Sequence, residues 1–339
     1  MGIFRSDDVA VGDRIVVRRL LPDTPGHLTD IIGHVVNVSP LVVRPQLVGG
    51  LESTAEAVEI PAELIKVVRK LSPRRIRNSD IRAVEVATAK AFPGIEHTWT
   101  TDGQWLMRAG DGITERSNSA APLGRSAGFG TVPLAELREF YARHDLPVKV
   151  LIPERIGAPA EKLVETGGWR LGPEIIVMTR PLADLHLKEE RSLVPELEFR
   201  LDAQPDADWL ALYNFRGQPL PVEALRLLQD QIDGEMGFGR LLTAAGETVA
   251  ITRGTLTASE DGRFWLGYSA VEVATAHRRR GLGTRLGAEM LAWGAASGAT
   301  DAYLQVIASN AAGRALYAKL GFIEHHRHRY ARLEEPTEG

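Results

Sequence analysis

The chain has 339 residues, of which 44% are hydrophobic and 25% are charged, values typical of a globular protein with two or three domains. Its net charge of −4 argues against a general polyanion binder, and the absence of cysteine excludes thiol nucleophiles, disulfides and thiolate metal sites. No apolar run reaches membrane-spanning length, and residues 1–13 do not form a secretory signal. We therefore expect no membrane association and, by default, a cytoplasmic location.

Residues 1–72 are expected to form a small β module. Three short β-rich runs, at 13–21, 29–38 and 41–46, are followed by a strand, a single helical turn and a strand within 58–71. Several short strands with tight turns predict a small barrel, and this segment resembles SH3-like barrels. Such a barrel either docks a partner or packs against its neighbours. Because no functional site is visible in it, we favour the packing role.

The exit from this module is basic. Its cationic residues are Lys66, Arg69, Lys70, Arg74, Arg75 and Arg77. Contact with nucleic acid is one interpretation, but the run has no aromatic side chains on which bases could stack. A solvated linker around Ser72 and Pro73 is therefore preferred, and we do not expect a nucleic-acid partner.

The middle block, residues 73–185, alternates helices and strands. A helix over 80–92 is expected first, and two strands within 97–110 follow it, joined by a turn at Asp102 and Gly103. The remaining elements are a strand at 116–123, a helix at 134–144, a strand at 148–153, a helix at 159–167 and a strand at 174–180.

The second half of the chain repeats this block. A shift of 153 residues brings the two segments into one register without a gap. Matching pairs are Arg125 with Arg278, Gly128 with Gly281, Gly130 with Gly283, Thr131 with Thr284, Leu151 with Leu304 and Gly168 with Gly321. A register held across loop, helix and strand indicates two copies of one β-α-β-α-β unit, separated by a polar linker over about 181–198.

We expect the chemistry to lie in the stretch 265–283. Residues 265–273 predict a strand, and an apolar stripe predicts a helix that begins at the end of the stretch. The stripe consists of Leu282, Leu286, Met290 and Trp293. Between strand and helix, Arg278–Gly283 has the spacing R-x-x-G-x-G, which differs from the triphosphate and dinucleotide fingerprints. Free N–H groups at the helix N-terminus, flexible glycines and arginines suit a pyrophosphate, although a plain solvated turn is an equal alternative from the loop alone.

Two segments together resemble a known family. VEVATAHRRRGLGTRL at 271–286 and SNAAGRALYAKLGF at 309–322 are similar to the GNAT superfamily of acyl-CoA-dependent N-acyltransferases. The resemblance covers the last 195–339 region well, the middle block weakly and the first module not at all. It implies an α+β fold class, with two GNAT-like mixed sheets flanked by helices after the small all-β SH3-like barrel. In this family acetyl-CoA lies between the splayed fourth and fifth strands, and no metal is implied.

The resemblance implies acetyl-CoA as a co-substrate. Its pyrophosphate would lie on the amides at the start of the helix, and its pantetheine arm would pair with the main chain of the preceding strand. In the family the position of Asn310 contacts the cofactor arm, but a plain helix N-cap explains this residue equally well. The cofactor-binding candidates are Val271, Val273, Arg278, Arg279, Arg280, Gly281, Leu282, Gly283, Thr284 and Asn310.

Tyr317 and Glu272 are the catalytic candidates. The resemblance assigns Tyr317 as the general acid that protonates the departing CoA thiolate, and a core tyrosine is the alternative. An acceptor amine is mostly ammonium at neutral pH, so a base is useful, and Glu272 is the nearest carboxylate on the key strand. Glu272 could equally face solvent or pair with an arginine, and Tyr268 and Ser269 are weaker candidates for the base.

Three histidines near the C-terminus, His325, His326 and His328, raise the question of a metal site. Adjacent strand residues face opposite sides of a sheet, and no carboxylate completes a ligand set. We therefore expect a partly exposed strand and no metal.

The first copy lacks the decisive residues. Under the same shift Asn310, Tyr317 and Glu272 are replaced by Gly157, Val164 and Ser119. We therefore expect a degenerate GNAT-like domain at 73–185 and a catalytic domain at 195–339, as in tandem GNAT proteins. The degenerate copy still has Arg125, Gly128 and Gly130, with which it could hold a ligand.

The predicted activity is direct transfer of acetyl from acetyl-CoA to an amine on a small molecule or a protein, in a ternary complex. The alternative is a non-catalytic acyl-CoA-binding or adaptor protein whose barrel recruits a partner. The sequence carries no signal for the oligomeric state.

Overall fold

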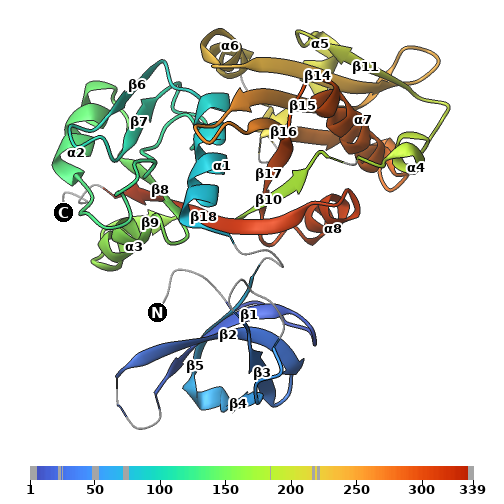
Figure 1. Ribbon diagram of the computed structural model, residues 1–339. Helices are drawn as coiled ribbons and strands as arrows, with labels where there is room; N and C mark the ends of the chain where they lie inside the picture. The colour runs from blue at the N-terminus through green and yellow to red at the C-terminus, as the bar shows by residue number, and fades with distance from the viewer. Residues whose placement is uncertain are drawn as a thin grey trace. The chain divides into compact units, whose positions relative to one another are not determined.

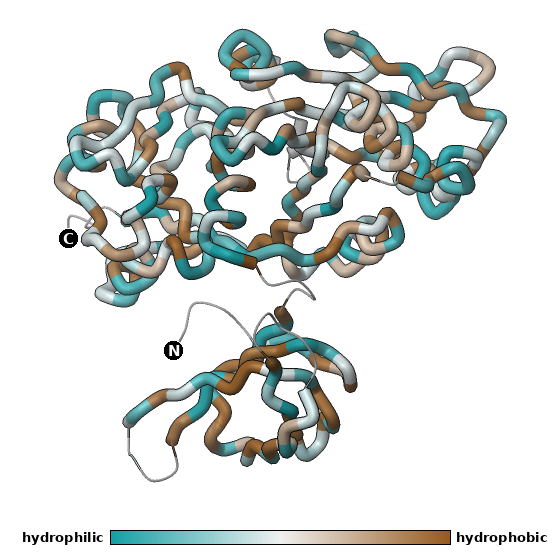
Figure 2. The backbone as a smooth tube through the Cα atoms, viewed as in Figure 1, coloured by the Kyte–Doolittle hydropathy of each residue, from teal (hydrophilic) through white to brown (hydrophobic). Residues whose placement is uncertain are grey.

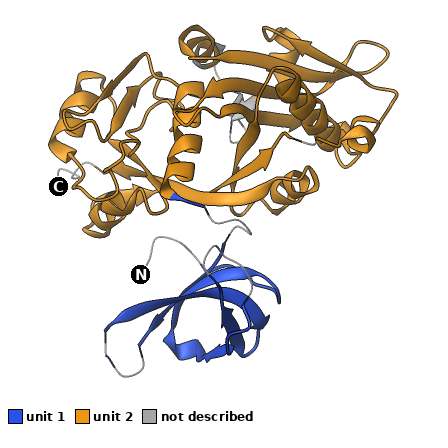
Figure 3. Cartoon of the chain, viewed as in Figure 1, with its two compact units in different colours: residues 1–77 blue, residues 78–339 orange. Residues whose placement is uncertain are grey.

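The computed structural model describes residues 6–334 except 22–23, 25, 48–52, 72–75, 184, 216–217 and 220–221. The chain divides into two compact units, Met1–Arg77 and Asn78–Gly339 (Figure 3). The expected linker at Ser72 and Pro73, with Arg74 and Arg75, lies outside the described residues.

The first unit is an antiparallel sheet of five strands. Its elements are β1 (Arg14–Leu20), β2 (Leu28–Asn37), β3 (Leu41–Pro45), β4 (Val58–Ile60), the 3-10 turn η1 (Ala62–Leu64) and β5 (Ile65–Lys70). They pair in the order β4-β3-β2-β1-β5. Buried side chains alternate along β1 at Ile15 and Val17, so one face of the sheet forms a small core, and hydrophobic residues recur along these strands in Figure 2. The expected short strands and helical turn are present, and the sheet is consistent with a small barrel-like domain.

The second unit is an α+β fold built on one large mixed sheet with helices on both faces (Figure 1). Its strands are β6 (Glu96–Trp99), β7 (Leu106–Ala109), β8 (Lys149–Pro153), β9 (Trp169–Leu171), β10 (Ile175–Pro181), β11 (Glu198–Asp202), β12 (Asn214–Phe215), β13 (Gln218–Pro219), β14 (Glu235–Leu242), β15 (Thr248–Ala258), β16 (Phe264–Val273), β17 (Asp301–Ile307) and β18 (Ile323–Leu333). Its helices are α1 (Asn78–Ala91), α2 (Leu134–Arg143), α3 (Ala158–Glu165), α4 (Lys188–Arg191), α5 (Ala207–Leu212), α6 (Val222–Gln231), the 3-10 turn η2 (Thr275–His277), α7 (Leu282–Ala296) and α8 (Ala311–Lys319). Among the described residues no helix is long and apolar enough to cross a membrane.

The nine-stranded sheet has the order β11-β14-β15-β16-β17-β10-β18-β8, and β9 also pairs with β18. Neighbours are antiparallel except for β16 and β17, which are parallel. Helix α7 packs on β14, β15 and β16, and α1 packs on β15 and β16. The predicted stripe of α7 faces this sheet, because Leu282, Leu286 and Met290 are almost fully buried.

The two copies of the repeat are visible in the element order. Helix α3 begins at Ala158 and α8 at Ala311, which are 153 residues apart, and β8 and β17 precede them. Strands β8, β9 and β10 of the first copy share the large sheet with strands of the second copy, whereas β6 and β7 pair only with each other. Strand β10 of the first copy lies between β17 and β18, and β18 of the second copy pairs with β8 (Figure 1). Because Ile176, Val177 and Met178 are all buried, β10 fits a central position that is covered on both faces.

One expected strand, at 116–123, is not formed. The segment makes two isolated bridges, Leu106 with Ala121 and Ala120 with Val150. The side chain of Asn118 accepts from the backbone N–H of Gly110 at 2.8 Å and donates to the carbonyl of Thr114 at 2.8 Å. These local hydrogen bonds hold the backbone in turns instead of a ladder.

Candidate functional site

The predicted site lies where β16 parts from β17. The two strands pair in parallel from Trp265–Tyr268 on β16 with Asp301–Leu304 on β17, and β16 then runs on to Val273 without this partner. The side chains of 265–268 are buried, whereas those of 269–273 are half-buried. The end of the parallel ladder therefore leaves one edge of β16 without β17 over its last five residues.

A β-bulge in β16 sets which side chains face which way. Ala270 has φ +56°, and the pairing with β15 shifts from Arg253 opposite Ser269 to Ile251 opposite Glu272. The extra residue puts Ser269 and Glu272 on the same face of the sheet. Bulges of this kind often re-aim a side chain next to an active site.

The backbone of β16 also has a defined orientation. The N–H of Ala274 donates to Val249 on β15 at 2.9 Å. Because backbone groups of successive strand residues point to opposite edges, those of Val271 and Val273 point away from β15. This is the orientation that a pairing pantetheine arm requires. Arg278 donates from Nε to the carbonyl of Val273 at 3.1 Å, so that carbonyl is already engaged.

The loop at 278–283 leads directly into α7. Gly281 is the N-cap residue with φ +86°, a conformation in which a side chain is strained, and Leu282 and Thr284 are buried behind it. No side chain caps α7. The amides of its first turn are therefore free of a capping side chain, as an anion site requires. A Cβ at Gly283 would lie 3.2 Å from Leu316 of α8, so the chain is close-packed there.

The three loop arginines differ in their surroundings. All three are exposed, and Arg279 has φ +61°. Arg280 donates to Glu196 at 3.1 Å and lies 3.2 Å from Nδ1 of His277. Exposed pairs of this kind are weak, so Arg280 can exchange Glu196 for a ligand phosphate.

Asn310 is the N-cap of α8. Its side-chain oxygen accepts from the N–H of Gly313 at 2.9 Å. The capping interpretation of this residue is therefore correct, and its amide nitrogen is not used by that bond.

Tyr317 and Glu272 interact electrostatically. Burial raises the pKa of Tyr317 to about 12, and the negative charge of Glu272 contributes to the shift. Burial also raises the pKa of Glu272, and the charge of Arg278 opposes this shift. The ring of Tyr317 contacts that of Tyr268 edge to face, with centroids 6.1 Å apart. The raised pKa keeps the phenol of Tyr317 protonated near neutral pH, and Glu272 is near enough for its charge to act on that phenol.

The first copy offers a different arrangement at 125–130. Phe129 is 86% exposed, Pro133 precedes α2 without a side-chain cap, and Arg82 donates to the carbonyl of Arg125 at 3.2 Å. Arg125 lines a cavity of about 330 Å³ together with Arg82 and Glu260. A second cavity of about 460 Å³ is bounded by residues 185–188, 191 and 192 and by two residues of α7. None of the cofactor or catalytic candidates lines either cavity.

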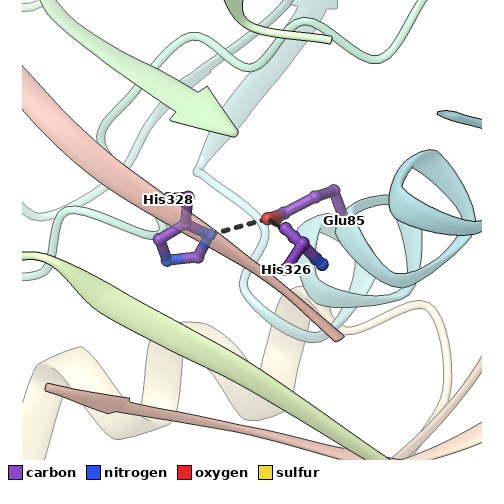
Figure 4. A group of neighbouring side chains, drawn as sticks. All are labelled: Glu85, His326 and His328. Atoms are coloured by element: carbon purple, nitrogen blue, oxygen red, sulfur yellow. Dashed lines mark hydrogen bonds and ion pairs between the residues drawn. The ribbon is translucent and has the colours of Figure 1, made fainter. Parts of the chain in front are cut away.

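The histidine cluster corrects one step of the sequence argument. A carboxylate does complete a set: Oε1 of Glu85 on α1 lies 2.8 Å from Nε2 of His326 and 2.7 Å from Nδ1 of His328 (Figure 4). His326 and His328 face the same side because they are two residues apart on β18. All three are buried, not partly exposed, so the expectation of an exposed strand was wrong here.

Hydrogen bonds between imidazoles and one carboxylate account for this cluster. Burial lowers the pKa of His326 and lowers that of His325 to about 2, and Nδ1 of His325 lies 2.8 Å from Nδ1 of His326. The cluster joins β18 to α1. The sequence feature that could have indicated this cluster is Glu85, a charged residue on the buried face of α1 between Ile81 and Thr88.

The bulged strand that parts from its parallel neighbour and the glycine loop at a helix N-terminus are the features expected of an acyltransferase of the GNAT superfamily. Solved structures of GNAT proteins have a similar fold. A GCN5-related N-acetyltransferase from Kribbella flavida has a TM-score of 0.55 at 16% identity, over 76% of this chain and 96% of its own. A tandem GNAT protein from the clavulanic acid biosynthesis pathway has a TM-score of 0.54 at 17% identity, over 75% and 89%. These likenesses support the tandem arrangement of the fold.

The chain belongs to the family described as "Probable histone acetyltransferase Rv0428c C-terminal", which matches residues 78–331. The Mycobacterium tuberculosis protein named "Probable histone acetyltransferase Rv0428c" is 34% identical over 323 residues, 94% of each chain. "Uncharacterized N-acetyltransferase YobR" of Bacillus subtilis is 25% identical over 257 residues, covering 73% of this chain and 97% of its own. The chain is thus a GNAT-type enzyme whose family binds acyl-CoA.

Proposed function

We propose that this enzyme transfers acetyl from acetyl-CoA directly to an amine carried by a small molecule or a protein. One observation carries the proposal: β16 parts from β17 after Tyr268, beside the N-terminus of α7 that no side chain caps. The first turn of α7 would hold the pyrophosphate, with Gly281 and Gly283 allowing close approach. The outward-facing backbone of Val271 and Val273 would orient the pantetheine arm.

The residues have separate roles in this reaction. Glu272 accepts a proton from the ammonium form of the acceptor, and its raised pKa makes it a stronger base than an exposed carboxylate. As the N–C bond forms and the C–S bond breaks, Tyr317 donates its phenolic proton to the thiolate. The proton that nitrogen loses on forming the amide restores the phenol. The N–H of Val271 points to the side on which oxygen of the thioester becomes negative, and it would stabilise that charge.

Steady-state kinetics with thiol detection test these roles. Tyr317→Phe should lower kcat by roughly 10²-fold or more, the usual contribution of a general acid, while acetyl-CoA affinity measured by calorimetry stays nearly constant. Phe322→Leu changes a residue whose ring also contacts Tyr317 and is the control for packing. A fully active Tyr317→Phe enzyme would remove the acid role. Tight acetyl-CoA binding with no transfer to any amine would instead favour an acyl-CoA-binding protein.

A further inference from the structure

A buried arginine lies beside the proposed base. Arg253 on β15 is 1% exposed and stands directly opposite Ser269, on the same face of the sheet as Glu272. Its Nε donates to Oγ of Ser269 at 3.3 Å, and its Nη1 donates to the hydroxyl of Tyr213 at 3.3 Å. Both partners are neutral, and both bonds are long.

The charge of Arg253 has no carboxylate partner among the described residues. Its guanidinium lies 5.1 Å from the ring centre of Phe92, and a second guanidinium, of Arg116, lies 3.9 Å from the same ring. Apart from this ring contact, Arg116 forms no hydrogen bond or ion pair within the described part of the chain. Burial lowers the pKa of Arg116, and the charge of Arg253 adds to this shift. The positive charges of Arg253 and Arg116 therefore lie near each other in a largely desolvated site.

Other buried arginines have the charged or polar partners that would be expected for Arg253. Arg240 is bound by two aspartates at 2.6 and 2.7 Å, and Arg327 is bound by two glutamates, both at 2.7 Å. Arg108 donates to backbone carbonyls and to a serine, and it lies in the field of Glu85. A buried cation without a counter-ion is costly, and such a charge is balanced when a ligand supplies the anion.

We propose that the acceptor is an amine that also carries a carboxylate, which Arg253 binds while Glu272 faces the amine and Arg116 adds positive potential. This inference rests on the proposed acetyl transfer. Arg253 and Glu272 are diagonal neighbours across the β15–β16 pair, a relation that separates Cβ atoms by roughly 7 Å. That span suits the two charged ends of a small amino acid. It does not suit a polycationic segment, which the two arginines would repel.

Matched acceptors test the proposal on the unaltered enzyme. The common amino acids and their α-carboxamides are compared for acetyl-CoA-dependent thiol release. A carboxylate bound by a guanidinium should raise kcat/KM for the acids by roughly tenfold to hundredfold over the amides. Equal or greater turnover of the amides, or a preference for lysine-rich peptides, would overturn the anionic acceptor while leaving acetyl transfer to amines intact.

Variants then locate the anion site. In Arg253→Gln the ratio of acid to amide turnover should fall towards one, and Arg253→Lys should retain part of it. Arg138→Gln, at an exposed arginine of α2, should keep the full ratio. An unchanged ratio in Arg253→Gln would refute the role of Arg253. Acetyl-CoA affinity, measured by calorimetry for each variant, shows that the fold is preserved.

A binding experiment separates this proposal from the proposed reaction. If no amine is acetylated, the N-acetyl amino acids and their amides are titrated into the enzyme by calorimetry. Tighter binding of the acids that is lost in Arg253→Gln would support the anion site even though acetyl transfer had failed. No difference between acids and amides would overturn the anion site itself.

Discussion

Mild acid should destabilise this enzyme through the histidines of β18. Burial lowers the pKa of His325 to about 2, so its imidazole stays neutral in the folded chain, and burial also lowers the pKa of His326. An unfolded histidine has a pKa of about 6.5 and takes up a proton below it. Stability from a depressed folded pKa is complete above pH ~6.5 and is lost as the pH falls.

The size of this loss follows from proton linkage. Keeping His325 neutral costs about 1.4 kcal/mol of unfolding free energy between pH ~7.5 and ~5.5, and the lowered pKa of His326 adds to the loss in the same direction. Glu85 contributes little in this window. Its pKa is also depressed in the folded chain, and an unfolded glutamate takes up its proton only near pH ~4.3, so its contribution is lost below that range.

Urea unfolding followed by circular dichroism at three pH values measures the effect. The wild-type free energy of unfolding should fall between pH ~7.5 and ~5.5, and in His325→Asn the fall should be smaller by about 1.4 kcal/mol. His97→Asn, at an exposed histidine of β6, controls for the substitution itself. A wild-type stability that is flat over this range, or a fall that His325→Asn leaves unchanged, would refute the reasoning.

Three further predictions concern the cofactor loop, the base and a helix cap. Gly283→Glu should weaken acetyl-CoA binding in calorimetry by at least roughly tenfold, because it places a negative charge on the anion site, whereas Gly130→Glu at the matching position of the first copy should not. The kcat/KM profile should rise with pH through an apparent pKa above the usual glutamate value, and Glu272→Gln should abolish that limb; a limb that persists would place the base elsewhere. Asp206→Ala should cost about 2 kcal/mol in urea unfolding, since Asp206 caps α5 and binds the buried Arg240, and Asp206→Asn should cost less because it keeps the cap.

Local signals in the sequence were sufficient to predict the secondary structure around the candidate site. The glycine spacing and apolar stripe at 278–293 define a loop and helix that need no distant partner, and Asn310 caps the helix that follows it. The bulge at Ala270 left no such signal. It depends on the register with β15, and it decides that Glu272 faces the same side as Ser269.

Long-range partners were beyond the reach of sequence patterns. Glu85 contacts His326 across 241 residues of chain. Arg253 differs from other buried arginines only in lacking an acidic partner among the residues that the structure describes. The position of β10 between β17 and β18 was likewise not predicted. The sequence of a strand at the end of the first copy does not indicate which strands it will pair with.

The exchange of β10 and β18 has a consequence for synthesis on the ribosome. The first copy cannot complete its edge at β8 until residues 323–333 have been translated, because β18 is the strand that pairs there. During elongation β10 likewise lacks its two neighbours, β17 and β18, and its apolar side chains stay uncovered until β17 has been translated. The two copies therefore mature together near the end of translation, and neither half would close its sheet if it were produced alone.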